Sequence, residues 1–518
     1  MLRRDFLYGT AVGSVLASNF SIANIPIQAQ AMPSMQIESQ ENDNILVIVQ
    51  LFGGNDGLNT IVPAENDQYY NKFRTKVNVA KNQAIRLGNS DTFMNQNLKS
   101  GISNGMFGMY NEGNLAVIQG VGYDNHNLSH FRSTDIWLSA KIPVNDSERL
   151  ETGWMGRYFE KLLQNGIPND PYCMNIGSSS SLLFQTPKAD ISISVENPEE
   201  FYDRGKDILS GENPMAGSGM YDSEFNFLYD ISLQSNKYSQ VVKKAFDAGK
   251  NTTKFETDKL SKQLQLVSRL ISGGLKTKVY LVSIDGFDNH ANQGSENGVH
   301  GNLLKNLSNA VSSFMADLKA QKKHENVLGI TVSEFGRRPN DNASYGTDHG
   351  AASVMFAFGQ PVNGKIFGQN LSFTNLNKNA DFKNQFDYRQ VYDEIMNKWF
   401  KTDDATTKDL LSGRFSLIET GILGKIITAT EVLEEEKSLI YPNPSIDGKI
   451  TLALNFKQNT KVSIEQYGLN GQNYGILCSQ TLPQGRAKIQ IELLGGAGVY
   501  LLNVIKNEQK ETLKVLRL

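Results

Sequence analysis

The stretch that decides the fold is KVYLVSIDGFDNHANQ, residues 278–293. Its first half is a short run of apolar and β-branched residues, which predicts a β-strand. Its second half turns polar at once and contains Asp285, Asp288 and His290. His290 is one of only six histidines in the chain. The pattern predicts a buried strand whose carboxyl end carries candidate metal ligands.

Four other apolar runs have the same character, at residues 44–51, 113–122, 326–336 and 353–359. Strands that are apolar on both faces are typical of parallel sheets covered by helices. Helical periodicity follows in residues 297–323. The alternation of strands and helices predicts an α/β sandwich with a mostly parallel central sheet.

Carboxylates and histidines follow four of these strands or lie in the adjoining loops. They are Asp56, Asp285, His290, Glu334, Asp348 and His349. Ligands of such sheets bind at the carboxyl ends of the strands. Asp and Gly are also common turn residues, which is the alternative interpretation of each stretch taken alone. Because mixed oxygen and nitrogen ligands suit zinc and other borderline divalent cations, we expect one or two metal ions there.

Composition sets the class of protein. A length of 518 residues favours two to four domains. Hydrophobic residues make up 39% and charged residues 20%, which is typical of globular chains. The net charge of −3 gives no basic field for nucleic acid. The two cysteines, Cys173 and Cys478, fall in different predicted domains and exclude a disulfide framework.

The first 31 residues have the layout of an export signal. Arg3 and Arg4 precede a mildly apolar stretch that ends at Ala29-Gln30-Ala31. The paired arginines resemble a twin-arginine signal, which exports folded proteins. A membrane anchor is the alternative, but the apolar run is short and interrupted by polar residues and proline. We therefore predict a signal over residues 1–31 and no membrane-spanning segment elsewhere.

The last part of the chain reads as a separate β domain. After an acidic linker at residues 429–438, short alternating strands are separated by Asn-Gly, Asp-Gly and Gly-Gly turns. They predict an antiparallel β-sandwich of about 80 residues over 439–518. A carbohydrate-binding or immunoglobulin-like module is the alternative interpretation.

This tail also resembles the C-terminal sorting domain of the type IX secretion system of Bacteroidota. The resemblance lies in YPNP at 441–444, NGQ at 470–472, GVY at 498–500 and the basic strand at 514–518. It implies that the secretion machinery is a partner. It further implies passage through the periplasm and the outer membrane, removal of the tail, and a location on the cell surface or outside the cell.

The middle of the chain resembles the DUF1501 family, which is related to the alkaline phosphatase and sulfatase-like superfamily. The motifs are FGGNDGLNTIVP (52–63), SHFRSTDIW (129–137), GWMGRY (153–158), SIDGFDNHANQ (283–293), SEFGRRP (333–339) and GTDHG (346–350). The resemblance implies an alkaline-phosphatase-like domain over residues 44–428. It also divides the candidate ligands between two metal sites. One contains Asp285, His290 and His349, and the other contains Asp56 and Glu334, completed by Asp348 or Asn55. Phe335 stands where the superfamily usually has a histidine, so the second site has one ligand fewer.

The superfamily also requires a nucleophile at a helix N-terminus, where free N–H groups favour an oxyanion. Ser129 has this position in residues 124–141, although it could equally be an N-cap, and Ser133 is the second choice. His126 and His130 are the candidate general acids. Arg132, Arg337 and Arg338 are candidate clamps for phosphate or sulfate, although surface solubility is the alternative role for each.

We therefore expect an exported hydrolase of phosphate or sulfate esters, acting on an anionic small molecule or glycan. Zinc is the first choice of metal, with manganese, magnesium or calcium as alternatives. The chain has no Cys-x-Pro-x-Arg stretch, no G-x-S-x-G elbow, no HExxH and no P-loop, which sets other hydrolase classes aside. The alternative function is a surface-displayed binding protein that does not turn over substrate.

Overall fold

A computed structural model describes most of the chain. The described residues are 21–22, 25–26, 43–424 and 439–518, except for 146, 164–167, 188–189, 207–235, 442, 457–458, 483–484 and 507–508. The chain divides into two compact units, Met1–Lys425 and Ile426–Leu518. The predicted linker at 429–438 lies outside the described residues, and so does the predicted signal apart from the paired strands β1 (Ser21–Ile22) and β2 (Ile25–Pro26).

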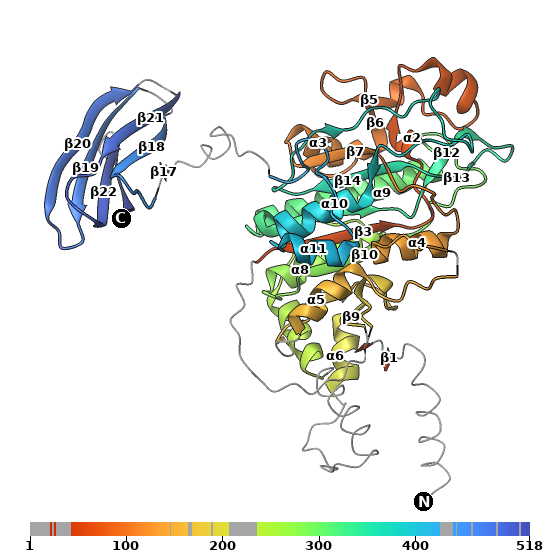
Figure 1. The fold of residues 1–518 in the computed structure, drawn as a ribbon, viewed down its shortest axis with the longest axis horizontal. Coiled ribbons are helices and arrows are strands. Elements are labelled where there is room, and N and C mark those ends of the chain that lie inside the picture. Colours follow the sequence, from red (N-terminus) through yellow and green to blue (C-terminus); the bar gives the residue numbers. More distant parts are fainter. Residues whose placement is uncertain are drawn as a thin grey trace, which may run out of the picture. The chain divides into compact units, whose positions relative to one another are not determined.

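A nine-stranded mixed sheet forms the centre of the first unit (Figure 1). In order across the sheet, its strands are β15 (Ile366–Phe367), β7 (Leu115–Gly122), β14 (Ser353–Phe358), β11 (Val327–Val332), β3 (Ile45–Leu51), β10 (Val279–Ile284), β8 (Cys173–Asn175) and β9 (Ser192–Ser194), while β16 (Phe386–Asp387) pairs with β7. All five predicted strands are present. The predicted α/β fold with a mostly parallel sheet is therefore confirmed.

Strand β14 is the exception to the parallel arrangement. It runs antiparallel to both of its neighbours, β11 and β7, whereas β11, β3 and β10 run parallel. The amino end of β14 therefore lies at the same edge of the sheet as the carboxyl ends of β3, β7, β10 and β11. The segment just before β14 is brought to that edge by this reversal.

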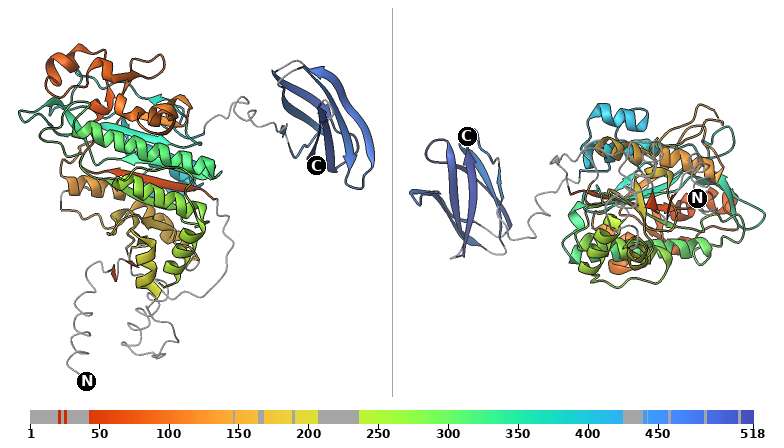
Figure 2. Two further views of the ribbon diagram at one scale, coloured as in Figure 1. Left: turned by 180° about the vertical axis from the view of Figure 1, so that it is seen from behind. Right: turned by 90° about the horizontal axis from the view of Figure 1, so that it is seen from below.

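Helices cover both faces of the sheet. Strand β3 alternates, since Val47 and Val49 belong to one apolar cluster and Leu46 and Ile48 to the other. The first cluster contains residues of α3 (Gly105–Asn111), α8 (Lys259–Ser272), α9 (Val299–Ala320), α6 (Pro198–Lys206) and a helix at 236–248. The second contains residues of α4 (His130–Ser139), α5 (Trp154–Leu163), α10 (Tyr388–Glu394) and α11 (Asp404–Leu411). Figures 1 and 2 show these two layers, with α10 and α11 on one side and α8 and α9 on the other.

A hairpin of β12 (Gly336–Asp341) and β13 (Thr347–Gly350) follows β11. Residues 347–350 pair with β12, which places His349 opposite Arg337. The two backbones approach closely here, since a Cβ atom on Gly350 would lie 2.4 Å from the Arg337 carbonyl carbon. A small sheet of β4 (Ile61–Val62), β6 (Phe93–Asn95) and β5 (Ala84–Arg86) lies after the short helix α2 (Gly57–Thr60).

The second unit is an antiparallel β-sandwich, as predicted. One sheet contains β17 (Leu439–Tyr441), β18 (Lys449–Phe456) and β21 (Gly485–Glu492), and the other contains β20 (Asn473–Leu482), β19 (Thr460–Gly468), β22 (Gly498–Lys506) and β23 (Gln509–Arg517). Alternate residues of both sheets form its apolar core. None of the helices in the described parts of the chain is long and apolar enough to cross a lipid bilayer.

Candidate metal centre

Three side chains from separate parts of the chain meet at the edge of the central sheet. His130 is the first residue of α4, Asp288 lies in the loop after β10, and His349 lies in β13. One ligand atom of each lies within 4.8 Å of the others. The Nε2 atoms of His130 and His349 lie 3.4 and 3.2 Å from the Asp288 carboxylate. Imidazole and carboxylate are ligands that zinc takes in proteins.

His290 joins this group from the same loop as Asp288. Its Nε2 atom lies 2.8 Å from the His349 Nε2 atom and 3.3 Å from Asp288 Oδ1. We call His130, Asp288, His290 and His349 the His–Asp cluster. Its members come from three loops or element ends that only the fold brings together.

Each histidine of the cluster is fixed through its other ring nitrogen. The Nδ1 atoms bond to Glu334 Oε1 at 2.8 Å (His130), the Leu128 carbonyl at 2.8 Å (His349) and Asp348 Oδ1 at 3.2 Å (His290). Carbonyl and carboxylate oxygens only accept hydrogen bonds, so each Nδ1 carries the hydrogen and donates it. The three Nε2 atoms then present lone pairs, which is how metal-binding histidines are usually held.

These lone pairs have no suitable partner without a cation. Two Nε2 atoms 2.8 Å apart repel each other unless a proton or a metal ion lies between them. The His130 Nε2 atom is buried and has no hydrogen-bond partner among the described residues. Both observations fit a metal ion held by the cluster.

The charge of Asp288 also suits a cation. Partial burial alone would raise its pKa, but the hydrogen bond and the positive charge of Arg337 lower the pKa to about 2. Burial lowers the pKa of His349, which favours the neutral imidazole. A carboxylate that is ionised and an imidazole that is neutral are the protonation states that bind metals.

An aromatic ring packs against two imidazoles of the cluster. Phe335 packs against His130 and His349, with ring centroids 4.9 and 4.3 Å apart. It is the residue that stands where the superfamily resemblance implies a histidine. Its ring requires Gly54, which has a φ of 83° and whose Cβ atom would lie 2.4 Å from the ring. Phe335 thus packs against two members of the cluster and offers no ligand atom.

Arg337, a predicted anion clamp, is fully buried and occupied. Its guanidinium donates to the carbonyls of Gly53, Gly54, Phe287 and Thr347 and to Asp288 Oδ1. All three nitrogens therefore have partners within the protein. Arg337 joins the loops after β3 and β10 to the hairpin and has no group free for a substrate.

Two predicted ligands lie outside the cluster. The Asp56 carboxylate is buried and held by Arg74, with Nη1 to Oδ2 at 2.5 Å and Nη2 to Oδ1 at 2.9 Å, and by Gln293 at 2.6 Å. Burial alone would raise the Asp56 pKa, but Arg74 lowers it, so the charge is already neutralised by a guanidinium. Asp285 is exposed and pairs with Lys259 at 2.6 Å.

Glu334 and Asp348 touch the cluster as hydrogen-bond acceptors. Glu334 Oε1 accepts from His130 and from the Gly53 backbone N–H at 2.8 Å, while Oε2 is buried and has no partner among the described residues. Asp348 accepts from His290 and from Asn342 at 3.0 Å. Both residues hold imidazoles in position in this arrangement.

The candidate catalytic side chains are spread over α4 and its approach. Ser129 is the exposed N-cap residue of α4, but its side chain makes no capping hydrogen bond. Ser133 is buried, and its hydroxyl donates to the Glu334 carbonyl at 2.5 Å and bonds to Tyr123 at 2.9 Å. His126 lies 3.6 Å from Asp381 and does not join the cluster. Of the two serines, only Ser129 has a free hydroxyl.

The spacing of residues 285–290 contains an indication that Asp288, and not Asp285, lies on the same side as His290. In an extended segment, residues i and i+2 face the same side, so Asp288 and His290 share a side while Asp285 does not. Gly286, with a φ of 103°, turns the chain between the two aspartates. No pattern pointed to Arg74 or to the Leu128 carbonyl, because both act through long-range contacts.

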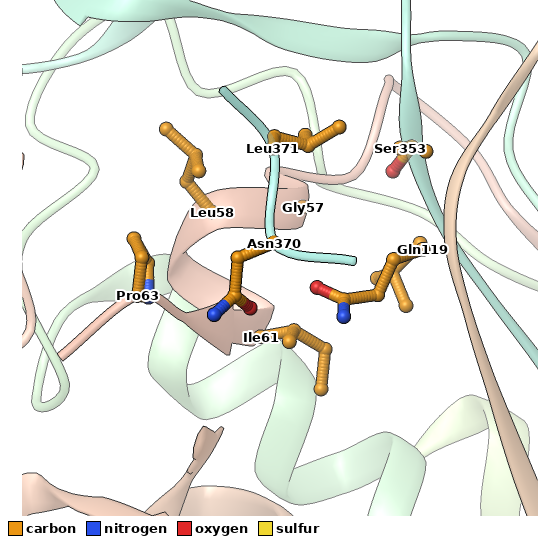
Figure 3. Close-up of a pocket in the computed structure, with 10 residues that line it drawn as sticks. Gly57, Leu58, Ile61, Pro63, Gln119, Ser353, Asn370 and Leu371 are labelled. Carbon is orange, nitrogen blue, oxygen red and sulfur yellow. The ribbon is translucent and has the colours of Figure 1, made fainter. Parts of the chain in front are cut away.

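A separate small pocket lies beside α2 and is too small for a substrate. Its lining is Gly57, Leu58, Ile61, Pro63, Gln119, Gly120, Ser353, Val354, Asn370 and Leu371 (Figure 3). The side chain of Gln119 extends toward Asn370 across it. Its volume of about 10 Å³ holds no more than a water molecule.

The fold and the cluster define an α/β protein with a candidate metal centre in its main unit. Residues 116–412 match the family described as "Protein of unknown function (DUF1501)", and the chain belongs to this family. Residues 439–517 match the secretion system C-terminal sorting domain, which marks a protein for export. Both resemblances seen in the sequence are thereby confirmed. Comparison with curated proteins gives no match.

Solved structures of the alkaline phosphatase superfamily overlap most of the chain at low identity. A superfamily protein from Vibrio parahaemolyticus has 9% identity and a TM-score of 0.34, with 84% of this chain and 83% of that chain covered. A sulfatase from Pseudoalteromonas sp. has 10% identity and a TM-score of 0.29, with 87% and 84% covered. An alkaline phosphatase from an Antarctic bacterium has 11% identity and a TM-score of 0.26, with 62% and 92% covered. All these TM-scores are below 0.5, so the overlaps carry no functional argument.

Replacement of Asp56 should destabilise the fold and leave the metal centre intact. Asp56→Asn leaves the buried Arg74 guanidinium without its counter-charge, which should lower the free energy of unfolding by about 3–5 kcal/mol. Chemical denaturation measures this loss. Asp285→Asn is the matched exposed control and should change stability by less than about 0.5 kcal/mol. Loss of metal from Asp56→Asn at native stability would show that Asp56 is a ligand.

Stability should fall in acid because of His300. This residue of α9 is buried and donates from Nε2 to Asn55 Oδ1 at 3.0 Å, and burial lowers its pKa to about 4. In the unfolded chain, His300 binds a proton near pH 6.5, whereas in the folded chain it stays neutral until about pH 4. The folded state therefore loses stability as the pH falls from 6.5 toward 4. This contribution amounts to roughly 3 kcal/mol.

The comparison of wild type with His300→Gln isolates this contribution. We expect the difference between their unfolding free energies to shrink as pH falls from 7 to 4.5, measured by urea denaturation at constant salt. Parallel pH profiles for the two proteins would contradict the assignment.

Proposed function

We propose that this chain is an exported hydrolase that uses a metal ion, held by the His–Asp cluster, to cleave a phosphate or sulfate ester. The observation that carries the proposal is the arrangement of three imidazoles. Each is fixed through Nδ1, and each directs Nε2 toward one ionised carboxylate. A cluster with a purely structural role would not need three unpaired nitrogen lone pairs at the surface of the sheet edge.

The ligand set favours zinc. His130, Asp288 and His349 form a three-ligand set of the kind that catalytic zinc sites use, because it leaves a position for substrate. If His290 also binds, four ligands fill a tetrahedral site, which is typical of structural zinc. A bound ion would polarise an ester oxygen and lower the pKa of a nearby hydroxyl. Manganese, magnesium and calcium are the alternative cations.

The chain's own groups supply the remaining roles. We assign Ser129 as nucleophile, since its hydroxyl is exposed at the start of a ten-residue helix and is not used as a cap. The N–H groups of that helix end favour an anionic ester group. Arg338 replaces Arg337 as the anion clamp. It is half-buried, donates from Nε to the His349 carbonyl at 3.4 Å, and has no other side-chain hydrogen bond or ion pair among the described residues.

A binding protein without turnover is the second candidate. The specific observation in its favour is the ion pair of Asp56 with Arg74. This pair occupies the carboxylate that a second metal ion would need, which leaves one of the two metal sites that the superfamily resemblance implies. A single ion with four protein ligands would have no position open for a substrate. It would stabilise the fold or hold a partner protein and would not act on a substrate.

The two ends of the chain support an exported location. We propose that residues 1–31 form a twin-arginine signal leading to the periplasm, and that residues 439–518 then direct the protein through the type IX machinery to the cell surface or beyond. The functional domain would span residues 44–428, with a linker at 429–438. A Bacteroidota source agrees with this route.

Metal content should follow the cluster and not the neighbouring carboxylates. Purified full-length protein, loaded with zinc and dialysed, should retain about one equivalent by elemental mass spectrometry. His349→Ala and Asp288→Asn remove ligand atoms and should lose the metal. Asp285→Asn, three residues from Asp288 in the same loop, is the matched control and should retain it. Zinc retained by both cluster variants, or lost only from the control, would refute the ligand set.

Replacement of Ser129 should remove turnover and leave everything else in place. Ser129→Ala should lower kcat for aryl phosphate and sulfate esters by at least about 1,000-fold, because it removes the nucleophile. Its melting temperature and zinc content should not change, since no capping bond is lost. Ser133→Ala is the control, and it should lose stability through its buried hydrogen bonds. Full activity in Ser129→Ala would exclude the serine mechanism, and no activity in the zinc-loaded wild type would favour the binding protein.

A further inference from the structure

The hairpin of β12 and β13 (Figure 1) has a turn at residues 342–346 that lies against the loop carrying His290. The backbone N–H groups of Asn292 and Gln293 donate to carbonyls of this turn at 3.0 and 2.9 Å. The approach is close, since a Cβ atom on Gly346 would lie 2.3 Å from the His290 carbonyl carbon. The turn therefore holds the backbone of one member of the His–Asp cluster.

Asn342 is the first residue of this turn, and both ends of its side-chain amide are used. Its Oδ1 atom accepts from the backbone N–H groups of Ser344 at 2.9 Å and Gly346 at 3.1 Å, which closes the turn. Its Nδ2 atom donates to the His290 carbonyl at 2.9 Å and to Asp348 Oδ1 at 3.0 Å. These partners fix the orientation of the amide, because N–H groups need an acceptor and the two oxygens need a donor.

Asp348 connects Asn342 to the imidazole of His290. Its Oδ1 atom, which accepts from Asn342, also accepts from His290 Nδ1 at 3.2 Å. The side chain of Asp348 is 54% exposed. A contact made by an exposed carboxylate alone contributes little, because the side chain loses conformational freedom when it is held. Asn342 supplies a second contact to the same oxygen and so restrains the carboxylate.

A second turn of the same form shows what the nitrogen of Asn342 adds. In residues 377–381, Asn377 Oδ1 accepts from the backbone N–H groups two and four residues later, at 2.9 and 3.0 Å. Its backbone N–H donates to the carbonyl four residues later, as in the turn at 342–346. Among the described residues, Asn377 Nδ2 donates no hydrogen bond. This form of turn therefore needs the amide oxygen and not the amide nitrogen.

We infer that Asn342 is a positioning residue that holds His290 for metal binding, through the Asp348 carboxylate and the His290 carbonyl. With Asp348 held against Nδ1, the hydrogen stays on that atom and Nε2 keeps its lone pair for the cluster. Outer hydrogen-bond partners of this kind typically change metal affinity by roughly 10–100-fold. The inference rests on the metal ion of the proposed function but not on turnover, so a protein that binds zinc without cleaving esters leaves it standing.

The variant Asn342→Asp keeps the oxygen that closes the turn and removes the donor. Asn377→Asp makes the same change in the second turn and is the matched control. We expect the purified full chain with Asn342→Asp to bind zinc at least about tenfold more weakly than wild type, measured by competition with a chelator at neutral pH. The control should bind zinc as wild type does. Equal zinc affinity in wild type and Asn342→Asp would overturn the inference.

Nitrogen NMR spectra of the metal-free full chain, with labelled histidines, separate this inference from the proposed function. We expect the Nδ1–H tautomer of His290 in wild type and in Asn377→Asp, and a mixture of both tautomers in Asn342→Asp. The resonance is assigned from its absence in His290→Gln. The same tautomer in all three proteins would overturn the inference, even if wild type bound no zinc and the proposed function failed.

An exchange variant separates positioning from a general loss of stability. Asn342→Asp combined with Asp348→Asn places the carboxylate and the amide at each other's positions, which restores a donor facing a carboxylate and keeps an oxygen facing His290. It should recover part of the zinc affinity that Asn342→Asp loses, and thermal unfolding shows whether both variants are folded. Zinc affinity no higher than that of Asn342→Asp alone would overturn the inference.

Discussion

The buried guanidinium of Arg337 is the contact on which the candidate metal centre depends. It binds four backbone carbonyls from the loops after β3 and β10 and from β13, and it also binds Asp288. Unsatisfied buried carbonyls are costly, so the hydrogen bonds of Arg337 stabilise the three segments in one relative position. The same side chain keeps Asp288 ionised. One residue thus fixes both the shape of the site and its charge.

The site draws on a second structural feature, the reversal of β14. Because β14 runs against its neighbours, the hairpin that precedes it ends at the edge where the parallel strands finish. That edge receives His349 from the hairpin, Asp288 and His290 from the loop after β10, and His130 from the helix after β7. Arg74 pairs with the buried carboxylate of Asp56, and Arg337 pairs with Asp288. The uncompensated lone pairs are therefore concentrated in the His–Asp cluster, where a single cation would satisfy them.

Local patterns predicted the elements, and long-range contacts decided the site. The runs at 44–51 and 278–284 read as buried strands because burial on both faces removes polar residues, and the long helix at 297–323 showed its period directly. The orientation of β14 could not be read, since an apolar strand looks the same in both directions. We predicted Asp285 and not Asp288 as a ligand because Asp285 directly follows the strand. The turn at Gly286 brings Asp288 to the cluster instead and leaves Asp285 exposed. Asp56 looked like a ligand because nothing in the sequence places Arg74 beside it.

The central claim is that a metal ion binds among His130, Asp288 and His349. The most direct measurement is an anomalous difference map from crystals of the zinc-loaded protein, recorded on both sides of the zinc absorption edge. We expect one peak about 2.0–2.2 Å from the Nε2 atoms of His130 and His349 and from a carboxylate oxygen of Asp288. A peak between Asp56 and Glu334, or no peak at the cluster under full zinc occupancy in solution, would contradict the account.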